Sequence, residues 1–201
     1  MISDYKTAKE NFMTLHLDGC REFFAQNSYA LEEAYCCILD DNLERASELF
    51  KKNINSDIRA HWGVYLVSML KLNAQICPSY FELRNFLEID LNILIQNAKG
   101  KYVQNVLAYT EYMSKINPEI YKFIGRVFYN NGLRDEGMYL FEMAKDAFYQ
   151  DPELHYLLAC AYLDRNDKKM ALHYAQTCQE VLPEYFPAVS LEKKIQSVAL
   201  N

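Results

Sequence analysis

Histidine and cysteine are the residue types of this chain that could bind a metal ion or act in catalysis. The histidines are spread widely along the sequence, at His16, His61, His155 and His173. None begins an HExxH pair, and no two of the six cysteines have the CxxC spacing of zinc and redox sites. The adjacent Cys36 and Cys37 should point to different faces of a helix. The sequence therefore predicts no metal site and no cofactor, while a Cys–His pair that meets only in the folded chain stays open.

Acidic pairs and one glycine–lysine pair are the other residues with possible chemistry. Gly100–Lys101 matches the end of a phosphate-binding loop, but no glycine precedes it at the required spacing. The carboxylate pairs Glu32–Glu33 and Asp135–Glu136 are typical of solvated helix starts, where negative charge suits the helix dipole. We predict that the protein has no catalytic residue and is not an enzyme.

Composition narrows the class of protein further. The 201 residues carry a net charge of −6, which argues against a general nucleic-acid binder, because such proteins need a basic surface. No apolar run approaches the roughly 18 residues that span a bilayer, and residues 1–6 lack the pattern of a secretory signal. Six cysteines without paired spacing favour reduced thiols over a disulfide framework. These features predict a cytoplasmic protein with no membrane insertion.

A helical pattern that occurs twice organises the elements of the chain. The first copy has apolar or small residues at Tyr121, Ile124, Gly125, Phe128, Gly137, Phe141 and Ala144. The second copy has matching residues at His155, Leu158, Ala159, Tyr162, Ala171, Ala175 and Cys178, followed by Pro183. In every matched pair the two residues are as far apart in the sequence as Tyr121 and His155 are. We call this separation the repeat interval. The interval predicts two helical hairpins that stack on each other, since one hairpin cannot cover its own apolar stripe.

The pattern resembles the tetratricopeptide repeat (TPR) superfamily, clearly over residues 118–185 and weakly over 17–54. The resemblance places Gly125 and Ala159 where the two helices of a hairpin come closest. Gly137 and Ala175 depart from the family pattern, which has alanine and a large residue there. Because Asp151–Pro152 arrives late in the pattern, we expect the helix that ends near Tyr149 to be about 4.5 Å longer than usual.

We predict an all-α fold, an α-α superhelix of stacked antiparallel helical hairpins with a C-terminal capping helix. The expected organisation is a single TPR-like domain over residues 1–201. It comprises irregular short hairpins (1–55), divergent helices (56–117), two TPR repeats (118–185) and the capping helix (186–201). The middle section is either a spacer or a divergent repeat.

Helical periodicity predicts several individual helices. Their expected ranges are 4–15, 29–39, 56–72, 79–98 and 101–116. Gly100 should end the fourth of these helices. Trp62 is expected in the core. The capping helix should bury a stripe of apolar residues at Ala188, Leu191, Ile195 and Val198.

In TPR proteins the first helix of each hairpin lines a concave face, and the resemblance implies a peptide-binding role for the matching positions. These positions are Glu119, Lys122, Arg126, Tyr129, Glu153, Tyr156 and Cys160. Lys122 and Arg126 lie four residues apart and could hold a carboxylate, or they are simply a solvated basic pair. The asparagine of the family's carboxylate clamp is absent, which argues against binding of chaperone C-terminal tails.

The expected function is a protein-interaction scaffold or adaptor that binds a protein segment in the concave groove. We expect that segment to be acidic and aromatic, with the aromatic contacts contributing more than the charges. One alternative is a TPR-type chaperone of a bacterial secretion system. Another is a docking or regulatory domain of a larger enzyme. The protein itself is expected to be a monomer or a weak homo-oligomer.

Overall fold

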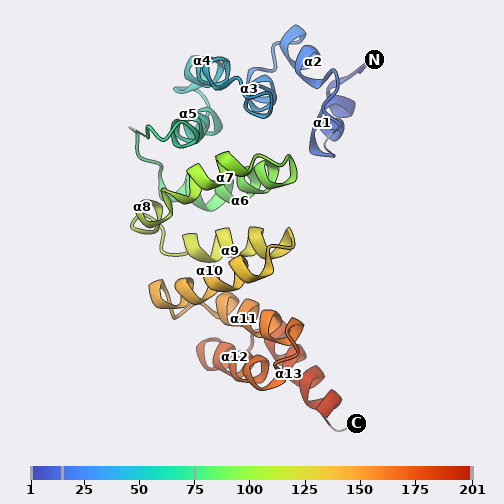
Figure 1. The fold of residues 1–201 in the computed structure, drawn as a ribbon, viewed down its shortest axis with the longest axis vertical. Coiled ribbons are helices and arrows are strands. Elements are labelled where there is room, and N and C mark those ends of the chain that lie inside the picture. Colours follow the sequence, from blue (N-terminus) through green and yellow to red (C-terminus); the bar gives the residue numbers. More distant parts are fainter. Residues whose placement is uncertain (1, 15, 75, 200–201) are drawn as a thin grey trace. The chain divides into compact units, whose positions relative to one another are not determined.

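A computed structural model describes residues 2–14, 16–74 and 76–199, with side chains described up to residue 197. These residues form thirteen helices and no strand (Figure 1). The helices are α1 (Tyr5–Met13), α2 (Cys20–Gln26), α3 (Ala30–Leu39), α4 (Leu43–Asn53), α5 (Ile58–Leu70), α6 (Tyr80–Gln96), α7 (Gly100–Leu107), α8 (Thr110–Ser114), α9 (Ile120–Asn130), α10 (Arg134–Ala147), α11 (Pro152–Asp164), α12 (Lys168–Val181) and α13 (Phe186–Ala199). The predicted all-helical fold is confirmed.

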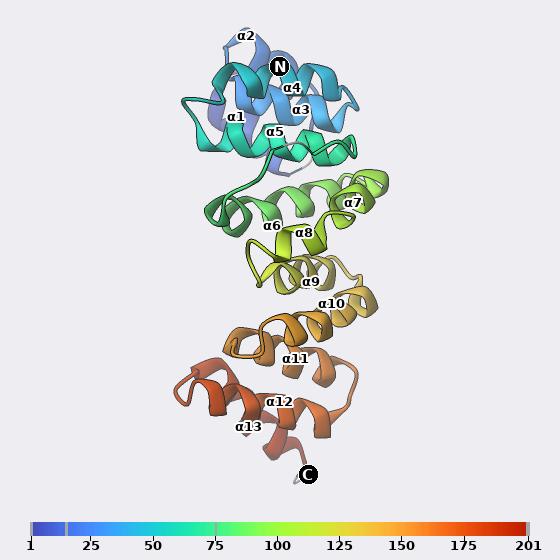
Figure 2. The same ribbon diagram turned by 90° about the vertical axis from the view of Figure 1, so that its left-hand side faces the viewer.

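The chain divides into two compact units, residues 1–113 and 114–201. In the N-terminal unit, α2 packs on α3, α3 on α4 and α4 on α5, while α6 and α7 form a further hairpin that contacts α5. In the C-terminal unit, helices α9 to α13 each pack on the next helix in the chain (Figure 2). Antiparallel hairpins are therefore the building block of both units. The single-domain organisation stays a prediction.

The turns between helices share one backbone motif. Six residues that follow a helix have a positive φ of 55–84°: Ser28, Asp41, Leu72, Ala98, Gly132 and Asn166. The backbone N–H after each of them bonds to a carbonyl five residues back, as from Leu133 to Phe128 at 3.0 Å. This is the Schellman motif, which ends a helix by satisfying its last carbonyls. The repeat interval separates Ala98 from Gly132 and Gly132 from Asn166. The period of the repeat therefore extends back to the turn between α6 and α7.

Two expectations about the middle of the chain are wrong. Gly100 does not end a helix, because α6 already stops at Gln96, Ala98 takes the left-handed turn position and Gly100 begins α7. The expected helix over 101–116 is divided into α7 and α8. Tyr109 lies between them, and its hydroxyl accepts a hydrogen bond from the backbone N–H of Ala74 at 3.2 Å. The break between α7 and α8 thus places the Tyr109 side chain against Ala74, which follows α5.

The expected extra length of the helix near Tyr149 is also wrong. Helices α10 and α12 have the same length of 14 residues, and the repeat interval separates their first residues, Arg134 and Lys168. In the connection before α11, the backbone carbonyl of Tyr149 accepts a hydrogen bond from the ring of His155. The repeat period is thus kept at the start of both helices.

Close packing inside the hairpins explains the small residues of the repeat. A Cβ atom on Gly125 would lie 2.8 Å from the ring of Phe141, so the predicted close approach at Gly125 is confirmed. A Cβ atom on Gly137 would lie 2.9 Å from the backbone nitrogen of Tyr129. Real Cβ contacts are almost never that short. Gly137, a departure from the family pattern, therefore lets α10 approach the backbone of α9.

Both units contain an apolar core. Trp62 is fully buried in the N-terminal unit, as predicted. In the C-terminal unit, Leu191 of α13 packs on a core cluster that includes Phe141 and Leu158. Ala188 and Ile195 of the expected stripe are buried, whereas the side chain of Val198, like the whole of Leu15 in the first predicted helix, lies outside the described residues. The capping role of α13 stays a prediction.

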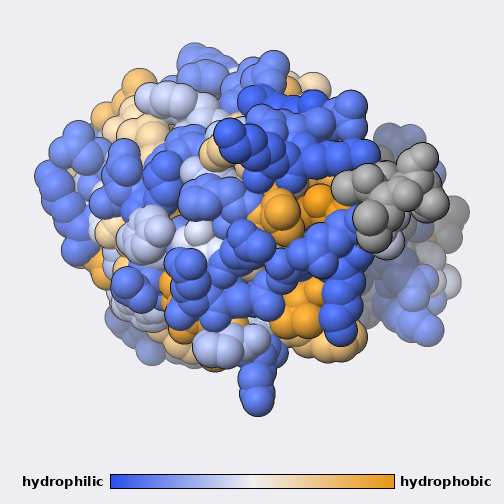
Figure 3. Space-filling model, turned by 90° about the horizontal axis from the view of Figure 1, so that it is seen from below, coloured by the Kyte–Doolittle hydropathy of each residue, from blue (hydrophilic) through white to orange (hydrophobic). Residues whose placement is uncertain are grey.

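The surface is mainly hydrophilic where Figure 3 shows it, with smaller apolar areas between the polar side chains. Among the residues that the structure describes, Phe186 and Tyr139 are the most exposed large apolar side chains. Within the same residues, no helix has both the length and the apolar character needed to cross a membrane.

Candidate functional site

Equivalent side-chain hydrogen bonds fix the backbone just before α9 and at the start of α11, where the first residues expected to bind a peptide lie. The side-chain Oδ1 of Asn117 accepts a hydrogen bond from the backbone N–H of Glu119 at 3.0 Å. Asp151, which follows Asn117 by the repeat interval, accepts one from the backbone N–H of Glu153, also at 3.0 Å. The bond at Asp151 caps α11 and satisfies a free N–H group at the helix start. Glu119, the residue before α9, and Glu153, the second residue of α11, thus occupy equivalent positions of the repeat.

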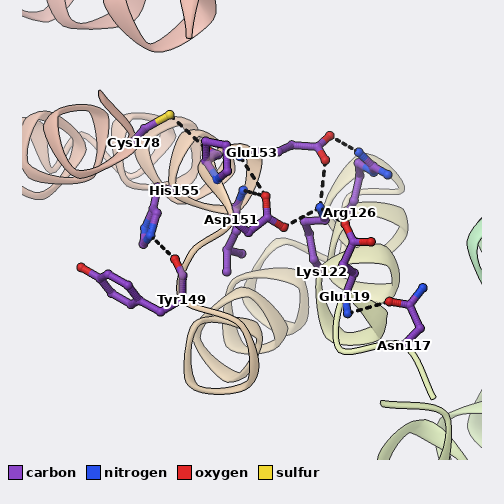
Figure 4. A network of polar contacts seen from close by, with 11 residues as sticks. Asn117, Glu119, Lys122, Arg126, Tyr149, Asp151, Glu153, His155 and Cys178 are labelled. Atoms are coloured by element: carbon purple, nitrogen blue, oxygen red, sulfur yellow. Dashed lines mark hydrogen bonds and ion pairs between the residues drawn. The ribbon is translucent and has the colours of Figure 1, made fainter. Parts of the chain in front are cut away.

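Lys122 lies at the centre of an ionic network between these two helices (Figure 4). Its Nζ atom is 2.8 Å from Glu119, 2.5 Å from Asp151 and 3.0 Å from Glu153. Burial alone lowers the pKa of Lys122, but the hydrogen bonds to Asp151 and Glu119 outweigh burial, and its pKa is raised. Three carboxylates thus hold the lysine in its charged form.

Arg126 extends this network toward solvent. Its guanidinium pairs with Glu153, which also contacts Lys122. The side chains of Arg126 and Glu153 are 27% and 38% exposed. One carboxylate therefore links a buried cation to a half-buried one, and the contact ties α9 to α11.

Lys122 does not offer free positive charge to a ligand, whereas a binding role for Arg126 stays a prediction. Lys122 is only 2% exposed and already surrounded by carboxylates of its own chain. Spacing along α9 correctly places the two cations on one face, but it cannot show that Asp151 and Glu153 approach that face from the next hairpin. Arg126 remains half-buried, with its charge engaged by Glu153.

Tyr129 is also engaged within the chain. Its ring lies 5.9 Å from that of Phe141 and under the guanidinium of Arg134, and its hydroxyl donates a hydrogen bond to Asp164 at 2.7 Å. Burial, followed by the bond to Asp164, raises the pKa of Tyr129 to about 12. Tyr129 therefore joins the two hairpins, and its side chain is half-buried.

Tyr156 and Cys160 lie one turn apart on α11 and share a face with Glu153. The ring of Tyr156 lies 5.7 Å from the ring of Tyr185, which precedes α13. A hydrogen bond with Cys160, followed by burial, raises the pKa of Tyr156 to about 12. Tyr156, Cys160 and Tyr185 are all half-buried. They form an aromatic surface next to the Arg126–Glu153 pair, which we call the α11 face.

Sequence reasoning missed Tyr185 and the role of His155. Tyr185 lies in the turn before α13, outside the repeat pattern, although it follows the cap residue Asp151 by the repeat interval. His155 is fully buried, and its Nε2 donates a hydrogen bond to the backbone carbonyl of Tyr149 at 2.8 Å, while its Nδ1 has no partner. Burial lowers the pKa of His155. Its role is thus to hold the connection before α11.

Metal binding has no support in the part of the chain that the structure describes. No group of three histidine, cysteine, aspartate or glutamate side chains there could hold an ion. The adjacent Cys36 and Cys37 are both buried in α3, and burial raises the pKa of the Cys36 thiol to about 12. A thiol with so high a pKa is a poor nucleophile near neutral pH.

Comparison with known proteins gives the following. No family model matches the chain, and no curated protein sequence matches it significantly. Among solved structures, the protein is similar to YrrB, which is described as a TPR protein with an unusual peptide-binding site. The two share 17% sequence identity, the match covers 86% of this chain and 96% of that chain, and the TM-score is 0.45.

Proposed function

We propose that the protein is a non-catalytic adaptor that binds a segment of another protein on the α11 face. The observation that carries this proposal is the aromatic surface formed by Tyr156 and Tyr185 beside Cys160. Tyr156 comes from α11 and Tyr185 from the turn before α13, and each keeps part of its surface open to solvent. A partly exposed aromatic surface is a common anchor for a protein partner.

The bound segment is recognised mainly through apolar and aromatic contacts. Lys122 is buried and paired three times, so it contributes no free charge to a ligand. Arg126 and Glu153 sit at the edge of the α11 face, where exposed ionic contacts contribute less than about 1 kcal/mol each. A desolvated tyrosine contact can contribute about 2 kcal/mol or more. The preferred segment therefore presents an apolar or aromatic side chain to Tyr156.

The test begins with affinity capture from the source cell and mapping of the captured partner to a short peptide. That peptide is then titrated against the full chain and against Tyr156→Ala. We expect the affinity to fall by a factor of about 30, the equivalent of about 2 kcal/mol. Tyr139→Ala is the matched control, because Tyr139 is a more exposed tyrosine on the second helix of the first repeat. Equal affinity of the parent and a normally folded Tyr156→Ala variant would disprove the assignment.

A further inference from the structure

A cavity in the N-terminal unit has a character unlike the α11 face. It lies between α4 and α5 and has a volume of about 260 Å³. Lys51 and Lys71 line it together with the apolar side chains of Val64 and Val67. No carboxylate lines it. An apolar floor with two lysines and no acidic side chain is unusual in a chain whose net charge is −6.

In other cavities of this unit, the lining side chains are either acidic or carry charges of both signs. One, of about 430 Å³ beside α1 and α2, is lined by Asp18 and Glu22 and by no cation. Another contains two arginines, but one of these, Arg45, forms a hydrogen-bonded pair with Glu33 of the same cavity. The α4–α5 cavity is thus the positively charged one in this set. Its charge selects for an anionic group.

The two lysines mark opposite ends of the α4–α5 cavity. Lys71 pairs with Glu44 at 2.9 Å, which places the end of α5 beside the start of α4. Lys51 follows Glu44 by seven residues, or two helical turns, so it lies about 10 Å further along α4. Glu44 is 79% exposed, and such surface pairs contribute little and exchange readily with other carboxylates. Among the described residues, Lys51 has no ion-pair partner.

We propose that the α4–α5 cavity binds an extended acidic segment of a partner protein, with an apolar side chain between two carboxylates. In an extended chain alternate side chains face the same way, so the pattern acid-x-apolar-x-acid directs all three to one surface. The carboxylates pair with Lys51 and Lys71, and the apolar side chain contacts Val64 and Val67. This site is separate from the α11 face and does not depend on the proposed function.

The experiment uses the full chain and a synthetic peptide, acetyl-Ser-Glu-Ser-Leu-Ser-Glu-Ser-amide. Its binding is followed at low ionic strength by the NMR shifts of backbone amides, which detect weak binding and report its location. We expect shifts at Val64 and Val67, a loss of affinity at about 0.15 M salt, and an affinity about tenfold lower for Lys51→Glu with Lys71→Glu. The matched control, Lys52→Glu with Lys169→Glu, makes the same charge change at exposed lysines outside the cavity. Its affinity should stay within about twofold of the parent.

Several outcomes would overturn the proposal. These are the absence of shifts at Val64 and Val67, an equal loss in the control variant, and equal binding of a peptide with glutamine in place of glutamate. A peptide with serine in place of leucine that binds equally, or inorganic phosphate that binds as tightly, would reveal a plain anion site and no peptide site. The variant Tyr156→Ala should bind the probe like the parent. A failure here is therefore distinct from a failure at the α11 face.

Discussion

Each unit of the protein holds a buried charged side chain at the centre of a polar network, Asp90 in the N-terminal unit and Lys122 in the C-terminal unit, and these two charges have opposite signs. In the N-terminal unit, Asp90 of α6 accepts hydrogen bonds from the indole N–H of Trp62 at 2.5 Å and the hydroxyl of Tyr35 at 3.0 Å, and it pairs with Arg59. In the C-terminal unit, Lys122 pairs with three carboxylates. Both side chains are 2% exposed. The N-terminal unit thus stabilises a buried negative charge, and the C-terminal unit stabilises a buried positive charge.

The difference lies in how many ionic partners each buried charge has. Asp90 relies on one cation, and the guanidinium of that cation, Arg59, lies 4.9 Å from the ring of Tyr35 and 4.5 Å from that of Phe86. Burial raises the pKa of Asp90 more than Arg59 and Trp62 lower it. Lys122 instead shares its charge among several carboxylates, one of which reaches solvent and Arg126. The first network is a closed pair, whereas the second extends toward the surface.

Removing each buried charge is the strongest test of this contrast. Asp90→Leu and Lys122→Met should each lower the free energy of unfolding by about 3–5 kcal/mol, because each leaves buried partners unpaired. Adding Arg59→Met to Asp90→Leu should restore part of the stability, since it removes the unpaired cation. No single second substitution should rescue Lys122→Met, because three carboxylates remain.

Urea unfolding followed by circular dichroism measures these changes across the chain. The fluorescence of Trp62, the single tryptophan, reports on the N-terminal unit. Lys168→Met is the control for loss of an exposed lysine charge, and it should change stability by less than about 0.5 kcal/mol. If any one carboxylate substitution rescued Lys122→Met as well as Arg59→Met rescues Asp90→Leu, the contrast would be incorrect.

The sequence predicted the fold of the C-terminal unit better than that of the N-terminal unit, for a local reason. The residues that recur in the repeat are those that pack closely within one hairpin, such as Gly125 against Phe141. The turn between α6 and α7 keeps the same period, but its left-handed position is occupied by Ala98, which carries no turn signal. A left-handed residue other than glycine costs about 1–2 kcal/mol and is not expected from sequence.

The candidate site was predicted less well, because its contacts join residues from different hairpins. Spacing placed Lys122 and Arg126 on one face of α9 correctly. It could not show that Asp151, at the start of the next hairpin, turns its carboxylate toward the same point. Asn117 and Asp151 are visible in the sequence at the repeat interval, but no contact with Lys122 was predicted from them.

Glycine substitutions test the packing side of the comparison and should have intermediate effects. Gly137→Ala should destabilise the C-terminal unit by about 1–3 kcal/mol, because the new Cβ would meet the backbone of Tyr129, which cannot move aside easily. The gain in helix propensity, about 1 kcal/mol, offsets only part of this cost.

Thermal unfolding of Gly137→Ala and Gly100→Ala measures the difference in stability between the two variants. Gly100, at the start of α7 in the N-terminal unit, has nothing within 4 Å of its Cβ position, so its substitution should be neutral or slightly stabilising. A neutral Gly137→Ala would show that α9 and α10 can separate without cost.

Of the changes considered, acidification should lower the stability of the protein least, and the loss should arise in the C-terminal unit. His155 is neutral with its proton on Nε2, because the carbonyl of Tyr149 can only accept, and a second proton on Nδ1 would find no acceptor. Asp151 favours that second proton, whereas burial, Lys145 and His173 oppose it, and the pKa of His155 is lowered.

A folded-state pKa below the usual value near 6.5 means that the unfolded chain binds the proton more tightly. The contribution of His155 to stability is therefore complete above about pH 6.5 and declines as the pH falls from there to the pKa of the folded state. His61 in the N-terminal unit has a different environment, because its Nδ1 lies 2.5 Å from the carboxylate of Glu82.

The measurement is the unfolding midpoint at about pH 7.5 and about pH 5.5, followed by circular dichroism and by Trp62 fluorescence. His155→Gln keeps a donor for the carbonyl of Tyr149 but cannot titrate, so its midpoint by circular dichroism should fall less on acidification than that of the parent. His16→Gln, which removes an exposed histidine of the N-terminal unit, should behave like the parent in this measurement. The acid-dependent loss should be absent from the Trp62 signal. If His155→Gln and the parent lost stability equally, the buried imidazole would not be the acid-sensitive group, and the closely spaced carboxylates around Lys122 would become the groups to test next.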